Sequence, residues 1–419
     1  MVSLIGSENF AAFRHRPFAM YWTAQLFSLM GTFMQNVALG YLVYQITGSK
    51  WLLGTIAIFQ LGPSLLLSLP AGVVADRVPR RTLVMTTQTT ALLLAFSLAT
   101  LTALHVLQVW EILVISTISG VAIAVESPAR QALVVNLVGG EDLANAIAWN
   151  SLSTNGAKVI GPAIGGVATA YFGVAPVFYF NSFSFLAMIV ALALMRIPFI
   201  RVERTRNAAG ELIEGLQVIR RTPAILLTLA LFGVVSMFAM NFPVLMPIFA
   251  RDVLHAGPEG LGWMWTANGL GAVAGSLTIV VWSRAAVGPR LLLATGLLTG
   301  VGELAMAGTR TLLPTLAALA VVGWATGAFM ASANASIQHR VGDAVRGRVL
   351  SAYSMIWAGS GPPGAIITAA LASAGGAPFP LAVAGGACVL ATLAFAPTLR
   401  RHLGQAPEVR FPTAGEAVG

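Results

Sequence analysis

Charged side chains are scarce in this sequence. Only 9% of its 419 residues are Asp, Glu, Lys or Arg, whereas a water-soluble domain carries roughly a quarter. Hydrophobic residues make up 57% of the chain, and the mean hydropathy is +0.81. Because so few polar groups cannot cover a folded chain of this length, lipid must be its main solvent. The scarcity of charge therefore excludes an ordinary soluble domain.

Cysteine and lysine are nearly absent. Cys388 is the one cysteine, so the chain can form no internal disulfide and no cysteine-paired metal site. Neither Lys50 nor Lys158 completes the G-x4-G-K-[ST] loop that a nucleotide-driven pump needs. The patterns H-E-x-x-H and G-x-S-x-G are also missing. The sequence therefore predicts no enzyme, no cofactor, no metal and no nucleotide, so any energy that the chain uses would come from an ion gradient, a solute gradient or a partner.

Apolar runs of about 20 residues, the length of one helical membrane crossing, recur along the whole chain. The first run is too long for the core of a signal peptide, so we expect it to be an uncleaved span. The predicted spans are 17–45, 51–75, 82–104, 107–127, 143–171, 174–195, 222–250, 260–283, 290–309, 312–337, 347–373 and 377–398.

These twelve predicted spans fall into two sets of six, separated by the longest polar connection. We therefore expect an all-α membrane protein of two pseudo-symmetric six-helix bundles. The predicted segments are an N-terminal bundle (1–196), a cytoplasmic linker (197–221), a C-terminal bundle (222–400) and a cytoplasmic tail (401–419). Gly161-Pro162 and Gly361-Pro362 hold matching places in the two halves. Repeated halves around a midplane site are typical of secondary transporters.

The basic residues follow the positive-inside rule. With the N-terminus inside, 20 of the 24 basic residues fall in inner segments, and Lys158 lies within a span. The three predicted outside are Lys50, Arg251 and Arg310. Both termini are therefore expected in the cytoplasm. The net charge of +9 reflects this topology; nucleic-acid binding would need basic residues gathered on one solvated face.

Four charges crowd into residues 76–81, between the second and third predicted spans. The surrounding stretch, AGVVADRVPRR, resembles the signature loop of the major facilitator superfamily, although Val74 and Pro79 replace the usual leucine and glycine. The residues that match the signature are Gly72, Ala75, Asp76, Arg77, Arg80 and Arg81.

Longer segments resemble the subgroup that includes the bacterial enterobactin exporter and the macrolide efflux proteins. These segments are 16–49, 126–167 and 345–355. The resemblance implies the major facilitator fold. It also implies a monomeric exporter in the bacterial cytoplasmic membrane, surrounded by lipid and acting on a small-molecule substrate.

The resemblance implies a charge latch at the inner membrane border. In the family, the aspartate that matches Asp76 meets the start of span eleven, here around 346–350. The arginine that matches Arg80 pairs with an acid closing span four, a place that Glu126 occupies. Cationic partners stabilise a carboxylate at such a border. The alternative is a solvated loop with ordinary inside-positive charge.

The fifth predicted span resembles the antiporter motif of drug–proton exchangers. The matching residues are Gly161, Pro162, Gly165 and Gly166. Ala148 and Ala157 replace two glycines of the motif. Small residues let helices approach closely and proline weakens the helical ladder, so this span can pack and bend between the two halves. The motif favours export; plain helix packing with no bearing on direction is the alternative.

Ionisable residues within the spans are candidates for proton coupling, namely Glu111, Glu126 and Lys158. A carboxylate can couple transport to protons when burial brings its titration near neutral pH, although Glu111 also fits a membrane-border carboxylate. Lys158 fits a partner of Glu126 or Asp76, a contact for an anionic substrate group, or a side chain that snorkels to the cytoplasmic edge. Glu303 lies in a span that is usually peripheral in the family.

Polar and aromatic residues of the spans that line the cavity in relatives are candidates for substrate contact. They are Gln25, Asn36, Tyr41, Asn150, Asn155, Asn241, Asn268, Trp324, Asn334, Tyr353 and Trp357. An apolar pocket with scattered amides suits amphipathic drugs or natural products better than sugars, although tryptophan in a span also serves helix packing. We therefore expect a proton-coupled multidrug antiporter. The alternatives are a dedicated siderophore or lysophospholipid carrier and, remotely, a non-transporting receptor or scaffold.

Overall fold

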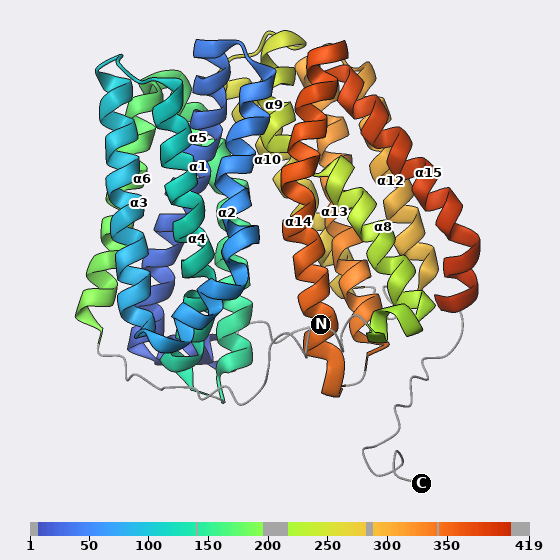
Figure 1. Cartoon of the computed structure of the whole chain (residues 1–419), viewed down its shortest axis with the longest axis horizontal. Coiled ribbons are helices and arrows are strands. Elements are labelled where there is room, and N and C mark those ends of the chain that lie inside the picture. Colours follow the sequence, from blue (N-terminus) through green and yellow to red (C-terminus); the bar gives the residue numbers. More distant parts are fainter. Residues whose placement is uncertain (1–6, 140, 196–216, 282–287, 342, 404–419) are drawn as a thin grey trace.

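The computed structural model describes residues 7–139, 141–195, 217–281, 288–341 and 343–403. Within these ranges the chain is helical and contains no strand. The elements are η1 (Ser7–Arg14), α1 (Arg16–Thr47), α2 (Lys50–Arg77), α3 (Arg80–Ala103), α4 (Val109–Val138), α5 (Leu143–Phe172), α6 (Val174–Leu194), α8 (Pro223–Ala239), α9 (Phe242–Asp252), α10 (Pro258–Val281), α12 (Pro289–Gly308), α13 (Leu312–Gln338), α14 (Asp343–Gly375) and α15 (Pro378–Leu403). Helices α1–α6 stand together in one half of the molecule, and α8–α15 in the other (Figure 1). We call these halves the N bundle and the C bundle.

The outer surface of the bundles is apolar. Nine helical segments of the described part are long and apolar enough to cross a membrane. Leu66, Phe172 and Leu313 are 82%, 73% and 78% exposed on the folded chain. Large apolar side chains gain nothing by facing water, but they match lipid tails. The fold is that of a multi-pass membrane protein, while the count of twelve spans and the side of the membrane that holds the termini stay predictions.

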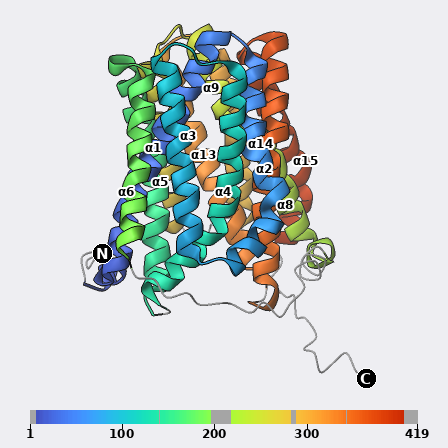
Figure 2. The same cartoon turned by 60° about the vertical axis from the view of Figure 1, so that its left-hand side comes forward.

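The predicted division into bundles, linker and tail also stays a prediction. Most of the predicted linker (197–221) lies outside the described residues, and so does the predicted tail beyond residue 403. The described bundles meet mainly through two pairs of helices, α2 with α14 and α5 with α10, and α9 makes smaller contacts with α1 and α2. Figure 2 shows α2 and α14 side by side along the edge of the molecule.

The two ends of the molecule differ, and we name each after a residue that lies there. At the Asp252 end, α1 passes into α2 and α9 finishes; at the Arg80 end, α3 begins. These are the upper and lower ends in Figure 1, and the bundles diverge toward the Arg80 end.

Buried apolar clusters show where the bundles are joined. One cluster, around Leu133, lies within the N bundle, and another, around Phe329, lies within the C bundle. A third unites Val43 of α1, Phe249 of α9 and Ala369 of α14, all fully buried. This third cluster crosses the interface in the half of the molecule nearer the Asp252 end. The two bundles therefore share a hydrophobic core at that end.

The predicted span 222–250 is split into α8 and α9. Met240 and Asn241, which lie between them, have non-helical backbone angles. Pro243 lacks an amide hydrogen, and its ring crowds the carbonyl four residues earlier, which weakens a helix at this point. The Asn241 Nδ2 donates instead to the Met237 carbonyl oxygen at 2.7 Å. The result is a joint within one membrane segment, which we call the α8–α9 joint.

Helix α4 is longer than predicted. The expected span ended at residue 127, but the helix continues through Pro128 to Val138. The apolar run stops near Glu126 because Glu126 and Arg130 are charged, yet these two side chains pair inside the bundle. A prediction from hydropathy alone ends the membrane span at such a charged pair, even when the pair is buried. Much of the predicted loop between spans four and five is therefore helical.

Candidate functional site

A polar network joins the two bundles at the Asp252 end. The Asp252 Oδ2 accepts a hydrogen bond from the Tyr44 hydroxyl at 2.7 Å and lies 3.2 Å from the Lys50 Nζ. Lys50 also donates to the Ala372 carbonyl oxygen at 3.2 Å. Tyr44 and Lys50 belong to the N bundle, whereas Asp252 and Ala372 belong to the C bundle. We call these four residues, together with Arg251, the gate network.

Arg251 adds a second link between α9 and α1. Its guanidinium donates to the Tyr44 carbonyl oxygen and lies 5.0 Å from the centre of the Tyr44 ring. The Lys50 and Asp252 side chains are 22% and 31% exposed, so water screens them, and such a pair contributes about 0.2–1 kcal/mol. The contact between the guanidinium and the ring adds roughly 0.5–1 kcal/mol. Contacts of this size link the two bundles at this end and are individually weak.

The local sequence brings Tyr44 and Lys50 together. Gly48 has a φ of 62°, a left-handed conformation that glycine adopts without strain, and its amide donates to the Tyr44 carbonyl oxygen at 3.0 Å. This turn ends α1 and starts α2 at Lys50. A cavity of about 420 Å³ lies beside the network. Its lining comes from α1 and from α9 with the loop that follows, and includes Tyr41, a predicted substrate contact, and His255.

Two glycines form the closest approach between α5 and α10. A Cβ atom at Gly262 would lie 2.8 Å from the Gly166 Cα, closer than real Cβ atoms come to another carbon. Farther along the same pair of helices, a Cβ at Gly269 would lie 3.0 Å from the Val159 Cγ2. Helices from different bundles thus meet almost backbone to backbone. Such contacts hold few interlocking side chains that would resist rotation.

The other predicted motif residues of α5 face α1. A Cβ at Gly161 would lie 2.8 Å from the Phe33 Cβ, and one at Gly165 would lie 2.7 Å from the Met34 Cα. Pro162 is buried between these glycines, and the helix runs through it unbroken. The motif therefore gives α5 two close-packed faces, one inside its own bundle and one toward the C bundle. Whether this arrangement sets the direction of transport stays a prediction.

Arg80 and Arg81 bind helix ends within the N bundle. The Arg80 guanidinium donates to the Asn136 Oδ1 in the last turn of α4 at 2.8 Å. Arg81 donates to two carbonyls at the end of α6, at 2.7 Å to that of Leu192. The last carbonyls of a helix lack amide partners and carry partial negative charge, which a guanidinium satisfies. The predicted pair between Arg80 and Glu126 is wrong in this structure, because helix α4 continues and presents Asn136 instead.

The rest of the predicted latch falls where side chains are not described. Gly72, Asp76 and Arg77 belong to the last turns of α2, but their side chains lie outside the described residues. The expected meeting of Asp76 with the start of α14, around 346–350, therefore stays a prediction.

Glu126 lies in a buried polar cluster of the N bundle. It is 8% exposed, and its Oε1 accepts hydrogen bonds from the Arg130 Nε and, at 2.7 Å, from the Gln88 Nε2. Tyr21 shares the Arg130 guanidinium, and the Ser28 hydroxyl donates to Gln88 at 3.4 Å. The Glu126 carboxyl group thus has a cation and an amide as partners inside the N bundle.

Lys158 does not pair with Glu126, which removes one of the alternatives that the sequence left open for it. Its ammonium has no ion-pair partner among the residues that the structure describes, and the side chain is exposed. At 3.6 residues per turn, position 158 lies between the face of α5 toward α1, which includes Gly161, and the face toward α10, which includes Gly166. Lys158 thus points into the space between α1 and α10, and its role there stays a prediction.

Glu111 caps its own helix. Its Oε2 accepts a hydrogen bond from the Gln108 amide at 2.8 Å, and the Gln108 side chain accepts one in return from the first turn of α4. This reciprocal capping box satisfies two orphan helix amides. The sequence allowed Glu111 to be either a proton-coupling carboxylate or a carboxylate at the membrane border. The capping geometry fits the membrane-border carboxylate.

The predicted substrate contacts are spread over both bundles. Asn36, Asn155 and Trp357 are exposed; Tyr41, Asn150, Asn268, Trp324, Asn334 and Tyr353 are half-buried; Gln25 and Asn241 are buried. Several of them bind other side chains: Gln25 donates to Asn150 at 2.6 Å, and Trp324 donates to Thr278 at 3.1 Å. Tyr353 stacks on Phe232 with ring centres 4.1 Å apart. These contacts hold helices together within each bundle.

Sequence reasoning missed the gate network and the surroundings of Glu303. A signal for the gate was present, because Lys50 and Arg251 are two of the three basic residues predicted outside. Basic residues are rare on the predicted outer side, so two of them there indicate an acidic partner nearby. Asp252, which follows Arg251 directly, is such a residue. No signal in the sequence distinguished Glu303 from a peripheral residue.

A solved structure shares the fold of this chain. A bacterial homologue of the human lysosomal transporter Spinster, in an inward-facing and unoccupied conformation, superposes with a TM-score of 0.71 at 12% identity, covering 94% of this chain and 99% of that one. This similarity shows that the chain has the fold of a major facilitator superfamily transporter. The sequence model of the family described as transmembrane secretion effector matches residues 7–411. The chain therefore belongs to that family.

Proteins similar to this chain in sequence include two that are named as efflux proteins. The multidrug efflux pump Tap of Mycolicibacterium fortuitum is 26% identical over 371 residues, which are 86% of this chain and 90% of that protein. Macrolide efflux protein A of Streptococcus pyogenes is 23% identical over 367 residues, 85% of this chain and 89% of that one. The uncharacterised transporter YfiS of Bacillus subtilis (strain 168) is 27% identical over 250 residues, and the match spans only 58% of its length.

Proposed function

We propose that this chain is a secondary active transporter that exports lipophilic or amphipathic small molecules from a bacterial cell in exchange for protons. It acts as a monomer in the cytoplasmic membrane, with both termini in the cytoplasm. The gate network carries the proposal, since it closes one end of the interface between two bundles with contacts weak enough to break. Two relatives named as efflux proteins support the direction of transport.

Alternating access follows from the contacts at the interface. To open the Asp252 end, Asp252 must separate from Tyr44 and Lys50 while α5 turns against α10 at Gly166 and Gly262. The ion pair and the guanidinium–ring contact of the gate network together contribute roughly 0.7–2 kcal/mol. Moving one charge through about 100 mV supplies roughly 2.3 kcal/mol. The energy from one coupling ion per cycle is therefore of the same size as these two contacts.

The exchange can be measured in everted membrane vesicles. Vesicles from cells with and without the chain receive an imposed proton gradient and either ethidium or radiolabelled erythromycin. We expect gradient-dependent accumulation of at least one probe, abolished by a protonophore, in vesicles that contain the chain. Equal accumulation in both kinds of vesicle for these and further dyes and macrolides would contradict the proposal.

A dedicated carrier of one anionic natural product, such as a siderophore, is the second candidate. The exposed Lys158 supports it, since an ammonium without an ion-pair partner among the described residues can hold an anionic group. In this case Lys158→Ala loses transport of anionic compounds only. Equal loss for neutral and anionic compounds would argue against it, and wild-type transport of both would leave Lys158 as a snorkelling side chain.

A further inference from the structure

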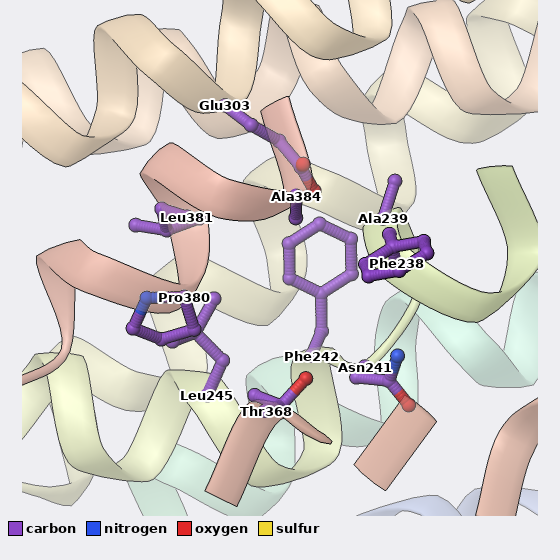
Figure 3. Close-up of a pocket in the computed structure, with 10 residues that line it drawn as sticks. All are labelled: Phe238, Ala239, Asn241, Phe242, Leu245, Glu303, Thr368, Pro380, Leu381 and Ala384. Carbon is purple, nitrogen blue, oxygen red and sulfur yellow. The ribbon is translucent and has the colours of Figure 1, made fainter. Parts of the chain in front are cut away.

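Glu303 is a buried carboxyl of the C bundle that takes no part in the gate network. It lies on α12 and is only 2% exposed, and its Oε2 has no hydrogen-bond partner among the described residues. Although the family resemblance suggested a peripheral span, the side chain points to the inside of the C bundle (Figure 3). Its surroundings therefore decide which protonation state it holds.

Those surroundings are apolar with two polar groups. The Glu303 side chain points into a cavity of about 10 Å³, which is close to the space that a single water needs. The polar side chains of the lining are Asn241 and Thr368. The others are Phe238, Ala239, Phe242, Leu245, Pro380, Leu381 and Ala384.

The helices around the cavity bring no cation to Glu303. Helices α8 and α13 contain no charged residue, and the charges of the others lie toward their ends. These charges are Arg251 and Asp252 on α9, Arg290 on α12, Asp343, Arg346 and Arg348 on α14, and Arg400 and Arg401 on α15. His402 of α15 lies at the same end as Arg401. The one titratable neighbour is the buried thiol of Cys388 on α15, which is uncharged.

Such a site favours the protonated acid. Burying an ionised carboxyl group among apolar side chains is costly, and no charge on the helices around the cavity offsets that cost. A protonated carboxyl needs only a hydrogen-bond acceptor. The site can therefore hold a proton, and it can ionise only if water or a polar group moves in.

The cavity is built around the α8–α9 joint. Asn241 and Phe242 line it from the joint, where the last carbonyls of α8 have no helical amide partners. Helix α14 packs tightly on the same point, because a Cβ at Gly364 would lie 2.5 Å from the Asn241 Nδ2. From the joint, α9 leads directly to Asp252 in the gate network. A change at Glu303 is thus connected to the gate through one short helix.

We propose that Glu303 is the carboxyl that binds and releases the coupling proton, and that its ionisation moves α9 and with it the gate network. The proton leaves from the carboxyl oxygen to water, and the carboxylate that remains draws water or the Asn241 amide toward it. This inference rests on the proposed proton exchange and adds the residue that performs it. It assigns coupling to the C bundle, in place of Glu111 and Glu126.

Infrared difference spectroscopy tests the protonation of Glu303 without any substrate. The full chain in lipid nanodiscs is titrated from acid to alkaline pH, and the carbonyl stretch of protonated carboxyl groups is followed. We expect a band in the wild type that disappears at alkaline pH, is absent in Glu303→Gln, and persists in Glu259→Gln, which changes an exposed acid at the start of α10. A spectrum unchanged by Glu303→Gln, or a band that never titrates, would overturn the proposal.

Transport separates the inference from the function on which it rests. We expect Glu303→Gln to lose gradient-driven accumulation of ethidium or erythromycin while it still exchanges the same probe across vesicles without a gradient. Size-exclusion elution and the thermal denaturation midpoint check that the variant is folded. If Glu303→Gln accumulates probe like the wild type, Glu303 is not the coupling carboxyl although export stands. If the wild type itself shows no gradient-driven transport, the proposed function fails, whereas the infrared result still decides whether Glu303 titrates.

Discussion

Glu126 and Glu303 are buried acids in a chain with few charges, one in each bundle. Glu126 accepts hydrogen bonds from Arg130 and Gln88, whereas Glu303 has an orphan oxygen in an apolar cavity. The first site is complete, because Glu126 has both a cation and an amide donor as partners, and removing Arg130 would leave an uncompensated carboxylate. Among the described residues, the Glu303 site lacks a cation that would stabilise the ionised carboxylate, so it favours the protonated carboxyl group. The comparison teaches that partners, and not burial, decide whether a membrane carboxyl supports the structure or is free to titrate.

The largest expected effect comes from removing the cation of the complete site. Arg130→Met leaves the Glu126 carboxylate buried without its cation, and we expect a loss of about 3–5 kcal/mol in the free energy of unfolding. The thermal denaturation midpoint in detergent, followed by tryptophan fluorescence, measures the loss. The double variant with Glu126→Gln is the control and should regain most of the stability. An unchanged midpoint in Arg130→Met would mean that the pair does not stabilise the N bundle.

A smaller effect is expected when the amide partner is removed. Gln88→Leu leaves Glu126 with Arg130 but without one charged hydrogen bond, which corresponds to about 1.5–3 kcal/mol. The same denaturation measurement applies, with Thr89→Val, an exposed position next to Gln88 on α3, as the control. A loss no larger than that of the control would show that Arg130 alone completes the site.

Asp252 is an intermediate case, paired but partly exposed, and its effect should be smaller again. Asp252→Asn removes a screened ion pair, so we expect closure of the gate to weaken by about 0.2–1 kcal/mol. A cysteine introduced at Ala250, a buried residue that lines the cavity beside the gate, should then react about 1.5- to 5-fold faster with a water-soluble maleimide. Cys388 is fully buried and adds no background, and Glu259→Gln is the control. A slower or equal rate would mean that Asp252 does not hold the gate.

The smallest effect on stability is expected at Glu303 itself. Since Gln has the shape of a protonated Glu, Glu303→Gln should change the free energy of unfolding by less than about 1 kcal/mol. Glu126→Gln, which strands Arg130, should cost clearly more in the same denaturation assay. Equal losses for the two variants would remove the distinction between the sites.

The sequence predicted the helical membrane fold, because a run of about 20 apolar residues indicates one membrane-spanning helix, whatever contacts its side chains make. It could not place the end of α4, where hydropathy counts the buried pair of Glu126 and Arg130 as a border. It also missed the α8–α9 joint, since other prolines, such as Pro162, lie within unbroken helices. The partners of Arg80, Lys158 and Glu303 depend on which side of each helix faces its neighbour. A hydrophobic pattern that is apolar all round does not contain that information.

The contacts between α5 and α10 have a mechanical consequence. They lie at positions 159 and 166 of a helix that runs from Leu143 to Phe172. At 1.5 Å per residue, the arm beyond this fulcrum is about 9 Å long toward the Asp252 end and about 24 Å long toward the Arg80 end. A helix pivoting there acts as an unequal lever. When α5 separates from α10 by one ångström at the Asp252 end, the lever moves the other end of α5 toward α10 by more than twice that distance. In the proposed transport cycle, a small opening at the Asp252 end therefore goes with a larger closure at the Arg80 end.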